Sequence, residues 1–146
     1  MSANRILLVE DNANDEKLML MALKESKITN DVDVVRDGEE ALDFLFCRGR
    51  HSKRDRMDVP QLILLDLKLP KIDGLDVLRE IRKNNLTKRI PVVVMTSSRE
   101  ENDLVAGYDN GANSYVVKPM DPVQFAKAVE HVGLYWLIVN TIPSVK

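Results

Sequence analysis

The chain has 146 residues, 45% hydrophobic and 30% charged, so it can bury the core of one globular domain and leaves little room for a second. The 21 Lys and Arg against 23 Asp and Glu give a formal charge of −2, which excludes an overall attraction to nucleic acid or anionic membranes. The single cysteine, Cys47, excludes an internal disulfide and is compatible with a reducing compartment.

Neither a signal peptide nor a membrane span is expected from the sequence. The first segment, MSANRILLVEDN, reaches acidic residues after four apolar ones. The longest apolar run, LYWLIV at 134–139, is far shorter than the roughly 20 residues that a membrane helix needs. We therefore expect a cytoplasmic protein.

Strand-like and helix-like segments alternate along the chain. Short apolar runs predict strands at 5–9, 31–36, 61–65, 90–95 and 114–117, of which the second is weaker and alternates as an exposed strand would. Apolar residues at helical spacing predict helices at 14–27, 38–47, 74–83, 99–109 and from about Pro122 onward. This order predicts a doubly wound α/β domain, with parallel strands and helices on both faces.

One connection, residues 48–59, is about twice as long as the usual handful of residues. It contains five Lys or Arg and His51, against Asp55 and Asp58. We interpret it as a solvated surface loop, and the alternative is a site for an anion or a partner.

Each long apolar strand is followed by polar residues on its carboxyl side. These residues are Glu10, Asp11, Asp66, Thr96 and Lys118. The carboxyl ends of parallel strands share one edge of the sheet, where ligands bind beside the reversal of strand order. A strand order of 2-1-3-4-5 would bring the three acids into one crevice, flanked by the threonine and the lysine.

Three carboxylates in one crevice repel each other unless a cation offsets their charge. Oxygen ligands without His or Cys favour Mg²⁺, with Mn²⁺ as a substitute. One carboxylate can then act as a nucleophile toward phosphorus, while Lys118 and Thr96 bind phosphoryl oxygens. Singly, the acids could cap a helix, the lysine could be a surface cation and the threonine an ordinary strand-end hydroxyl. Together these residues favour a site.

Four segments, LLVEDN, LILLDLKLPKIDGLDVL, VVVMTSS and GANSYVVKP, resemble a response-regulator receiver domain from about Arg5 to Glu130. The resemblance implies a flavodoxin-like fold with a five-stranded parallel sheet in the order 2-1-3-4-5. We expect a single domain over 1–146, with a core of about 5–130 and no output domain. Within the family, the long basic loop and the lack of an output domain resemble the small stand-alone regulators of cyanobacterial phytochrome kinases.

The resemblance also assigns roles near the acids. Asp66 matches the phosphorylated aspartate, Asp11 the main metal-binding acid, and Glu10 an acid that acts mostly through water. The backbone carbonyl of Lys68 matches a further metal ligand. The Lys68 side chain could lean over the phosphoryl group and change its lifetime, or it could simply be solvated.

The resemblance also assigns roles in the conformational switch that follows phosphorylation. Thr96 matches the switch hydroxyl, followed by the small residue Ser97, and Lys118 matches the phosphate-binding lysine. Tyr115 matches the aromatic that rotates on activation, although it could be a static aromatic at the edge of the core. The Lys118–Pro119 bond is one that the family usually holds in cis.

The segment 129–140, VEHVGLYWLIVN, is apolar nearly all round, and one helix can hide only one face on a small domain. We predict an extended C-terminal helix and a homodimer interface in the extension 131–146. Alternatively the extension folds back over the domain, bent at Gly133. The predicted interface residues are Leu134, Tyr135, Trp136 and Ile138.

The sequence therefore favours a two-component response regulator. A sensor histidine kinase, of phytochrome type, would phosphorylate Asp66 with Mg²⁺, which would change dimerisation or the choice of an unknown downstream protein. Such a protein turns over no separate substrate and is not an enzyme in that sense, and we expect no nucleic-acid binding. The enzymatic alternative is a Mg²⁺-dependent phosphatase with an aspartyl-phosphate intermediate, but VEDN fits poorly the D-x-D expected after its first strand. A third alternative is a pseudo-receiver or pure binding module. It would require the acceptor or the lysine to be missing, and both residues are present.

Overall fold

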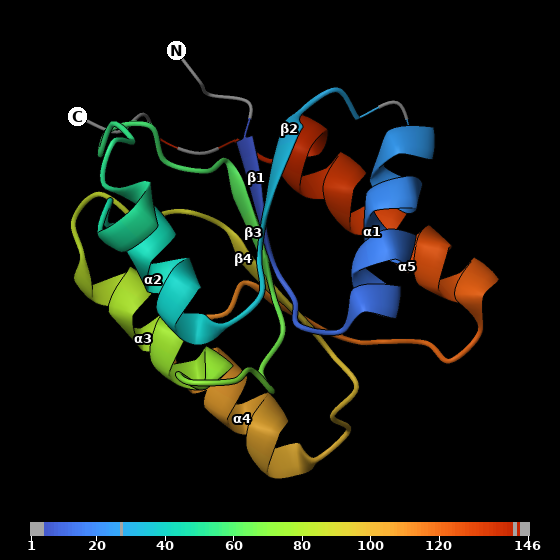
Figure 1. Ribbon diagram of the computed structural model, residues 1–146. Helices are drawn as coiled ribbons and strands as arrows, with labels where there is room; N and C mark the ends of the chain where they lie inside the picture. The colour runs from blue at the N-terminus through green and yellow to red at the C-terminus, as the bar shows by residue number, and fades with distance from the viewer. Residues whose placement is uncertain (1–4, 27, 142, 144–146) are drawn as a thin grey trace.

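The computed structural model describes residues 5–26, 28–141 and 143, which form alternating strands and helices (Figure 1). The strands are β1 (Arg5–Val9), β2 (Asp31–Val35), β3 (Leu62–Leu65), β4 (Val92–Thr96) and β5 (Ser114–Val117). The helices are α1 (Ala13–Glu25), α2 (Gly38–Leu45), α3 (Gly74–Lys83), α4 (Glu101–Asp109) and α5 (Pro122–Leu134). A 3₁₀ turn, η1 (Gly49–His51), and a π-helical turn, η2 (Tyr135–Val139), follow α2 and α5.

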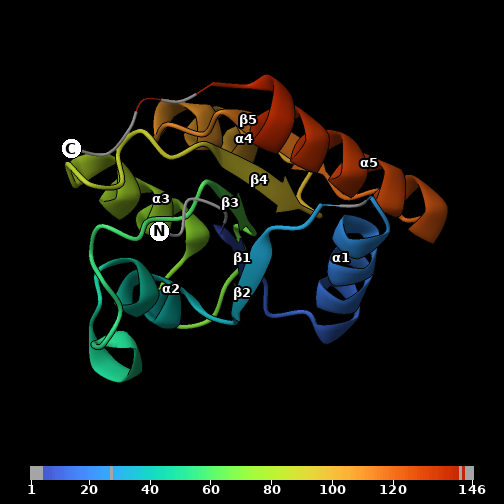
Figure 2. The ribbon, with the colours of Figure 1, turned by 90° about the horizontal axis from the view of Figure 1, so that it is seen from above.

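The five strands are parallel in the order β2-β1-β3-β4-β5, which confirms the predicted topology. Strand β3 is central and pairs with β1 on one side and β4 on the other. Helices α1 and α5 cover one face of the sheet, and α2 and α3 cover the other (Figures 1 and 2). The predicted α/β domain thus has helices on both faces.

The core has two parts, one on each face of the sheet. In β3, Leu62 and Leu64 pack toward α1 and α5, while Ile63 and Leu65 pack toward α2 and α3. All four side chains are fully buried. A strand covered on both faces needs apolar residues at every position, which explains the continuous apolar run.

Helix starts follow the local sequence. The side chains of Asn12, Asp37 and Asp121 cap α1, α2 and α5 by accepting hydrogen bonds from backbone N–H groups of the first turn. Pro122 occupies the first turn of α5, where its missing N–H costs no helical hydrogen bond. Because each of these helices follows a parallel strand, its capped amino end lies at the carboxyl edge of the sheet.

The C-terminal extension is partly covered and partly exposed. Helix α5 continues into η2, and Trp136 and Leu137 pack against the core of the α1 and α5 face. Tyr135, Ile138 and Val139 are exposed. One side of the extension thus packs on the domain without a break at Gly133, which lies inside α5, and a homodimer through the exposed residues stays a prediction. Positions 142 and 144–146 of the predicted segment 131–146, and position 27 of the predicted helix 14–27, lie outside the described residues. Within the described residues, no helix has the length and apolar character to cross a membrane.

Candidate functional site

The acids predicted at the carboxyl edge of the sheet lie close together. Glu10 and Asp11 follow β1, and Asp66 follows β3, which is the neighbour of β1. One carboxylate oxygen from each acid lies within 4.8 Å of the other two. Glu10 and Asp66 are buried, whereas Asp11 is exposed. Asp11 is therefore the acid of the cluster that solvent reaches.

Lys118, which follows β5, extends into this cluster. Its Nζ donates to Glu10 Oε1 at 2.7 Å and to Asp66 Oδ2 at 3.0 Å. It also donates at 2.8 Å to Oδ2 of Asp15, a residue that the sequence analysis did not single out. Asp15 lies in the first turn of α1, where an acid is common because it favours the positive end of the helix dipole, so its sequence position gave no separate signal.

Negative charge exceeds positive charge in the cluster. Burial raises the pKa of Glu10 to about 7, even though the hydrogen bond from Lys118 lowers it, and the nearby charge of Asp66 raises it further. Burial alone would lower the pKa of Lys118, but the hydrogen bonds to Asp15 and Glu10 and the charge of Asp66 outweigh that effect and raise it. The ammonium stays charged, and the surplus of carboxylates provides the donor set for a further cation.

The loop after β3 fixes the Asp66 carboxylate. The backbone N–H of Lys68 donates to Asp66 Oδ1 at 3.2 Å. The N–H of Gly74, the first residue of α3, donates to the carbonyl of Leu67 at 3.0 Å. A Cβ at position 74 would lie 2.3 Å from the carbonyl oxygen of Asp66, so only glycine permits this close approach.

A second set of contacts links the end of β4 to α4 and β5. Thr96 is fully buried, and its Oγ1 accepts from the N–H of Ser98 at 3.3 Å. Tyr115 is half-buried, and its hydroxyl donates to the carbonyl of Ser98 at 3.2 Å. Ser97, the small residue after the threonine, is exposed. Ser98, which the sequence analysis missed, therefore connects the predicted switch hydroxyl to the predicted switch aromatic.

The Lys68 side chain points toward α4. Its Nζ lies 3.3 Å from Asp103 Oδ2, and the hydroxyl of Ser98 donates to the same oxygen at 2.5 Å. The hydrogen bond from Ser98 lowers the pKa of Asp103, and Lys68 lowers it further. Lys68 therefore forms an ion pair with α4 while 68% of its side chain is exposed, and its effect on the lifetime of a phosphoryl group stays a prediction.

The predicted cis bond between Lys118 and Pro119 is absent, because no peptide bond among the described residues is cis. The trans form of a bond before proline is favoured by about 0.5–1 kcal/mol, so local context must favour cis for it to form. In this structure Lys118 reaches its three carboxylates from the trans form.

Residues 6–130 match the response regulator receiver domain. The chain belongs to the response-regulator receiver family. This receiver is 42% identical over 139 residues to Response regulator Rcp1 of Synechocystis, with 95% of this chain and 92% of Rcp1 covered. The family assignment agrees with the resemblance seen in the sequence.

Solved structures give the same result. The phosphorylated cyanobacterial phytochrome response regulator RcpA is 41% identical, with a TM-score of 0.90, and 97% of this receiver and 99% of that chain are covered. The Mn²⁺-bound form of Rcp1 is also 41% identical, with a TM-score of 0.88 and coverage of 96% and 99%. This receiver is thus a homologue of phytochrome response regulators, and the phosphatase alternative finds no support in these comparisons.

Proposed function

We propose that this receiver accepts a phosphoryl group on Asp66 from a phytochrome-type sensor histidine kinase and thereby acts as a cytoplasmic signalling switch. The observation that carries the proposal is the Asp66 carboxylate at the end of the central strand, grouped with Glu10 and Asp11 and bonded to Lys118 at 3.0 Å. The similarity to RcpA and Rcp1 supports the phytochrome link.

The donor set fits a hard divalent cation. We infer that Glu10, Asp11, Asp66 and the backbone carbonyl of Lys68 hold Mg²⁺, with Mn²⁺ as a substitute, because the three acids offer only oxygen ligands. The Mn²⁺-bound structure of Rcp1 supports a metal in this family. When bound, the cation offsets negative charge on the carboxylates and on an incoming phosphoryl group.

The chain's own residues can carry out the transfer. A carboxylate oxygen of Asp66 attacks the phosphorus of phosphohistidine, an O–P bond forms, the P–N bond breaks, and the imidazole leaves with its electron pair. Lys118 donates hydrogen bonds to phosphoryl oxygens, and Thr96 and the neighbouring Ser97 supply hydroxyl groups. Hydrolysis of the aspartyl phosphate restores the carboxylate, so the protein turns over no separate substrate.

The switch follows from the contacts of Thr96 and Tyr115. A phosphoryl group that engages the Thr96 hydroxyl removes it from the N–H of Ser98, and the same residue holds the Tyr115 hydroxyl. Phosphorylation thus changes the surface of α4 and β5. We propose that this change alters a homodimer formed through Leu134, Tyr135, Trp136 and Ile138, or binding to a downstream protein.

The proposal is tested by transfer from an autophosphorylated phytochrome-type histidine kinase. Phosphate is expected to move to the wild-type chain in Mg²⁺ and to remain on the kinase when the acceptor is Asp66→Asn. A Glu39→Gln variant, on the exposed start of α2, serves as the control and should accept phosphate normally. Equal labelling of wild type and Asp66→Asn would contradict the proposal.

A further inference from the structure

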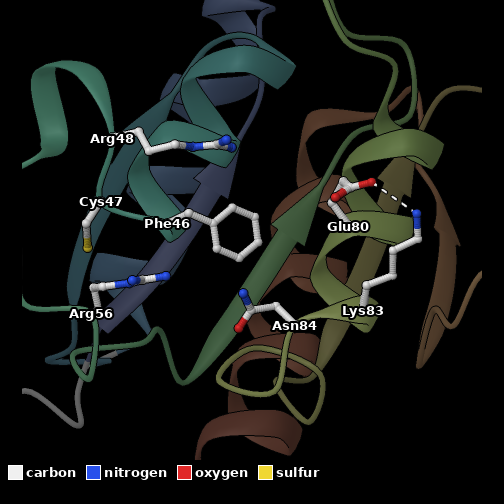
Figure 3. A pocket seen from close by; sticks show the side chains of 7 residues that line it. All are labelled: Phe46, Cys47, Arg48, Arg56, Glu80, Lys83 and Asn84. Carbon is white, nitrogen blue, oxygen red and sulfur yellow. Dashed lines mark hydrogen bonds and ion pairs between the residues drawn. The ribbon is translucent and has the colours of Figure 1, made fainter.

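A cleft of about 570 Å³ lies between the carboxyl ends of α2 and α3 and the loop 48–59 (Figure 3). Helices in a parallel α/β fold run opposite to the strands, so this cleft lies at the other edge of the sheet from Asp66. The cleft is therefore separate from the proposed phosphorylation site. Its lining residues are Phe46, Cys47, Arg48, Arg56, Glu80, Lys83 and Asn84.

Hydrogen bonds and a cation–π contact hold the loop in place on the α2 side of the cleft. Cys47 has a left-handed φ of 56°, and the N–H of Arg48 donates to the carbonyl of Asp43 at 2.8 Å, which turns the chain sharply after α2. Farther along the loop, the Arg54 guanidinium lies 3.8 Å from the centroid of the Phe44 ring and donates to the carbonyls of Phe44 and Asp58. The loop is therefore held against α2 by the turn at Cys47 and by the contacts of Arg54 with Phe44.

Three cations, Arg48, Arg56 and Lys83, and one acid, Glu80, line the cleft. Lys83 pairs with Glu80 at 3.4 Å, and Arg48 lies 3.8 Å from Asp43, with 58% of its side chain exposed. Arg56 has no ion-pair partner among the residues that the structure describes. The carboxyl ends of α2 and α3, each with about half a negative charge, offset much of the one positive charge that the ion pairs leave. The donors that an anion can use without breaking an ion pair are therefore those of Arg56, with the exposed Arg48 beside the same cleft.

An aromatic ring lies between the cations. Phe46 is half-buried and packs against the core on the α2 and α3 face. It also lines the cleft near Arg48 and Arg56, and Asn84, the residue after α3, lies on the opposite side (Figure 3). The Arg48 guanidinium carbon lies 5.5 Å from the Phe46 ring centroid. Aromatic rings and guanidinium groups stack on planar bases, and Arg also pairs with phosphate oxygens.

We propose that this cleft binds a nucleotide. The base stacks on Phe46, the phosphate pairs with Arg48 and Arg56, and the Asn84 amide and Glu80 carboxylate are available to the edge of the base. The volume falls within the range of small-molecule sites. An acidic peptide would use the arginines but gains little from a phenylalanine ring held between them, so the combination favours a nucleotide.

The test is isothermal titration of the full chain with AMP and GMP, with adenosine and inorganic phosphate as partial probes. EDTA is present throughout, so that no divalent cation can hold a phosphate at the acidic cluster. The variants are Arg48→Ala with Arg56→Ala, and Phe46→Leu. The control is Lys24→Ala, an exposed lysine of α1 on the other face of the sheet. Circular dichroism and thermal unfolding verify that each variant folds.

We expect AMP or GMP to bind more tightly than either partial probe. The double arginine variant should weaken binding by about tenfold, because charge-assisted hydrogen bonds are lost. Phe46→Leu should weaken binding several-fold. Lys24→Ala should have no effect. The proposal is overturned if neither nucleotide binds at millimolar concentration, or if binding survives the arginine substitutions. It is also overturned if phosphate binds as well as the nucleotides and Phe46→Leu changes nothing.

Discussion

At the scale of single residues, Lys118 controls the electrostatics of the acidic cluster. It is buried and donates to three carboxylates at 2.7–3.0 Å, two of which belong to the buried acids Glu10 and Asp66. A buried charge without a partner is far more costly than an exposed one. The lysine therefore stabilises the metal-free fold in addition to its proposed role toward phosphate.

We predict that Lys118→Met lowers the free energy of unfolding by about 3 kcal/mol in EDTA, because two carboxylates remain buried without their cation. Excess Mg²⁺ should restore part of the loss. Urea unfolding measures both values. The matched control is Lys68→Met, whose exposed ion pair should cost less than about 1 kcal/mol. Equal stability of Lys118→Met and wild type in EDTA would contradict the argument.

Lys68 has a second predicted effect, on the lifetime of the phosphorylated form. It follows Asp66 by two residues and is tied to Asp103 of α4, so its removal should loosen the segment beside the acceptor. We expect Lys68→Ala to speed the decay of the aspartyl phosphate by up to about fivefold, because losing an ion pair of less than about 1 kcal/mol lets water reach the site more easily. Decay is followed by intact mass after removal of the phosphodonor. An unchanged decay rate would show that only the Lys68 backbone matters.

At the scale of elements, the start of α4 depends on Asp103. This carboxylate accepts from the Ser98 hydroxyl and pairs with Lys68, and thereby joins α4 to the ends of β3 and β4. The same serine accepts from Tyr115 of β5. The position of α4 is thus coupled to the segment that follows β3, where the proposed acceptor Asp66 lies.

Asp103→Asn should lower the free energy of unfolding by about 1 kcal/mol at neutral pH, because a charge-assisted hydrogen bond becomes a neutral one. The folded pKa of Asp103 lies below the ordinary value of 3.8, so its contribution is present above that value and is lost as the pH falls through the lowered pKa. Urea unfolding of wild type and variant should therefore converge in acid. A difference independent of pH would contradict this origin.

The sequence left open whether the C-terminal extension packs on the domain or forms a dimer interface. Its apolar residues divide between packing and exposure, with Ile138 70% exposed and Trp136 packed on the core. We predict that Ile138→Glu shifts a homodimer toward monomer in sedimentation, because a charge would be buried in the interface. Met57→Glu, at a similarly apolar exposed position in the basic loop, is the control. A wild type that stays monomeric, phosphorylated or not, would refute the dimer.

At the scale of the whole molecule, most of the fold and part of the site could be predicted from the sequence. The alternation of apolar strands and helices fixes the layers, and polar residues at strand ends reveal the acids because strand ends share an edge. Asp15 and Ser98 were missed because their contacts come from a helix turn and a loop, which have no such periodic signal. The sequence did not predict the trans form of the Lys118–Pro119 bond either, because the two isomers of a bond before proline differ little in energy.

The most direct test of the central claim is the intact mass of the chain after incubation with acetyl phosphate and Mg²⁺. The wild type should gain one phosphoryl group, Asp66→Asn should gain none, and EDTA should prevent the gain in the wild type. A wild type that gains no phosphoryl group, or an Asp66→Asn variant that gains as much as the wild type, would contradict the assignment of Asp66 as the acceptor.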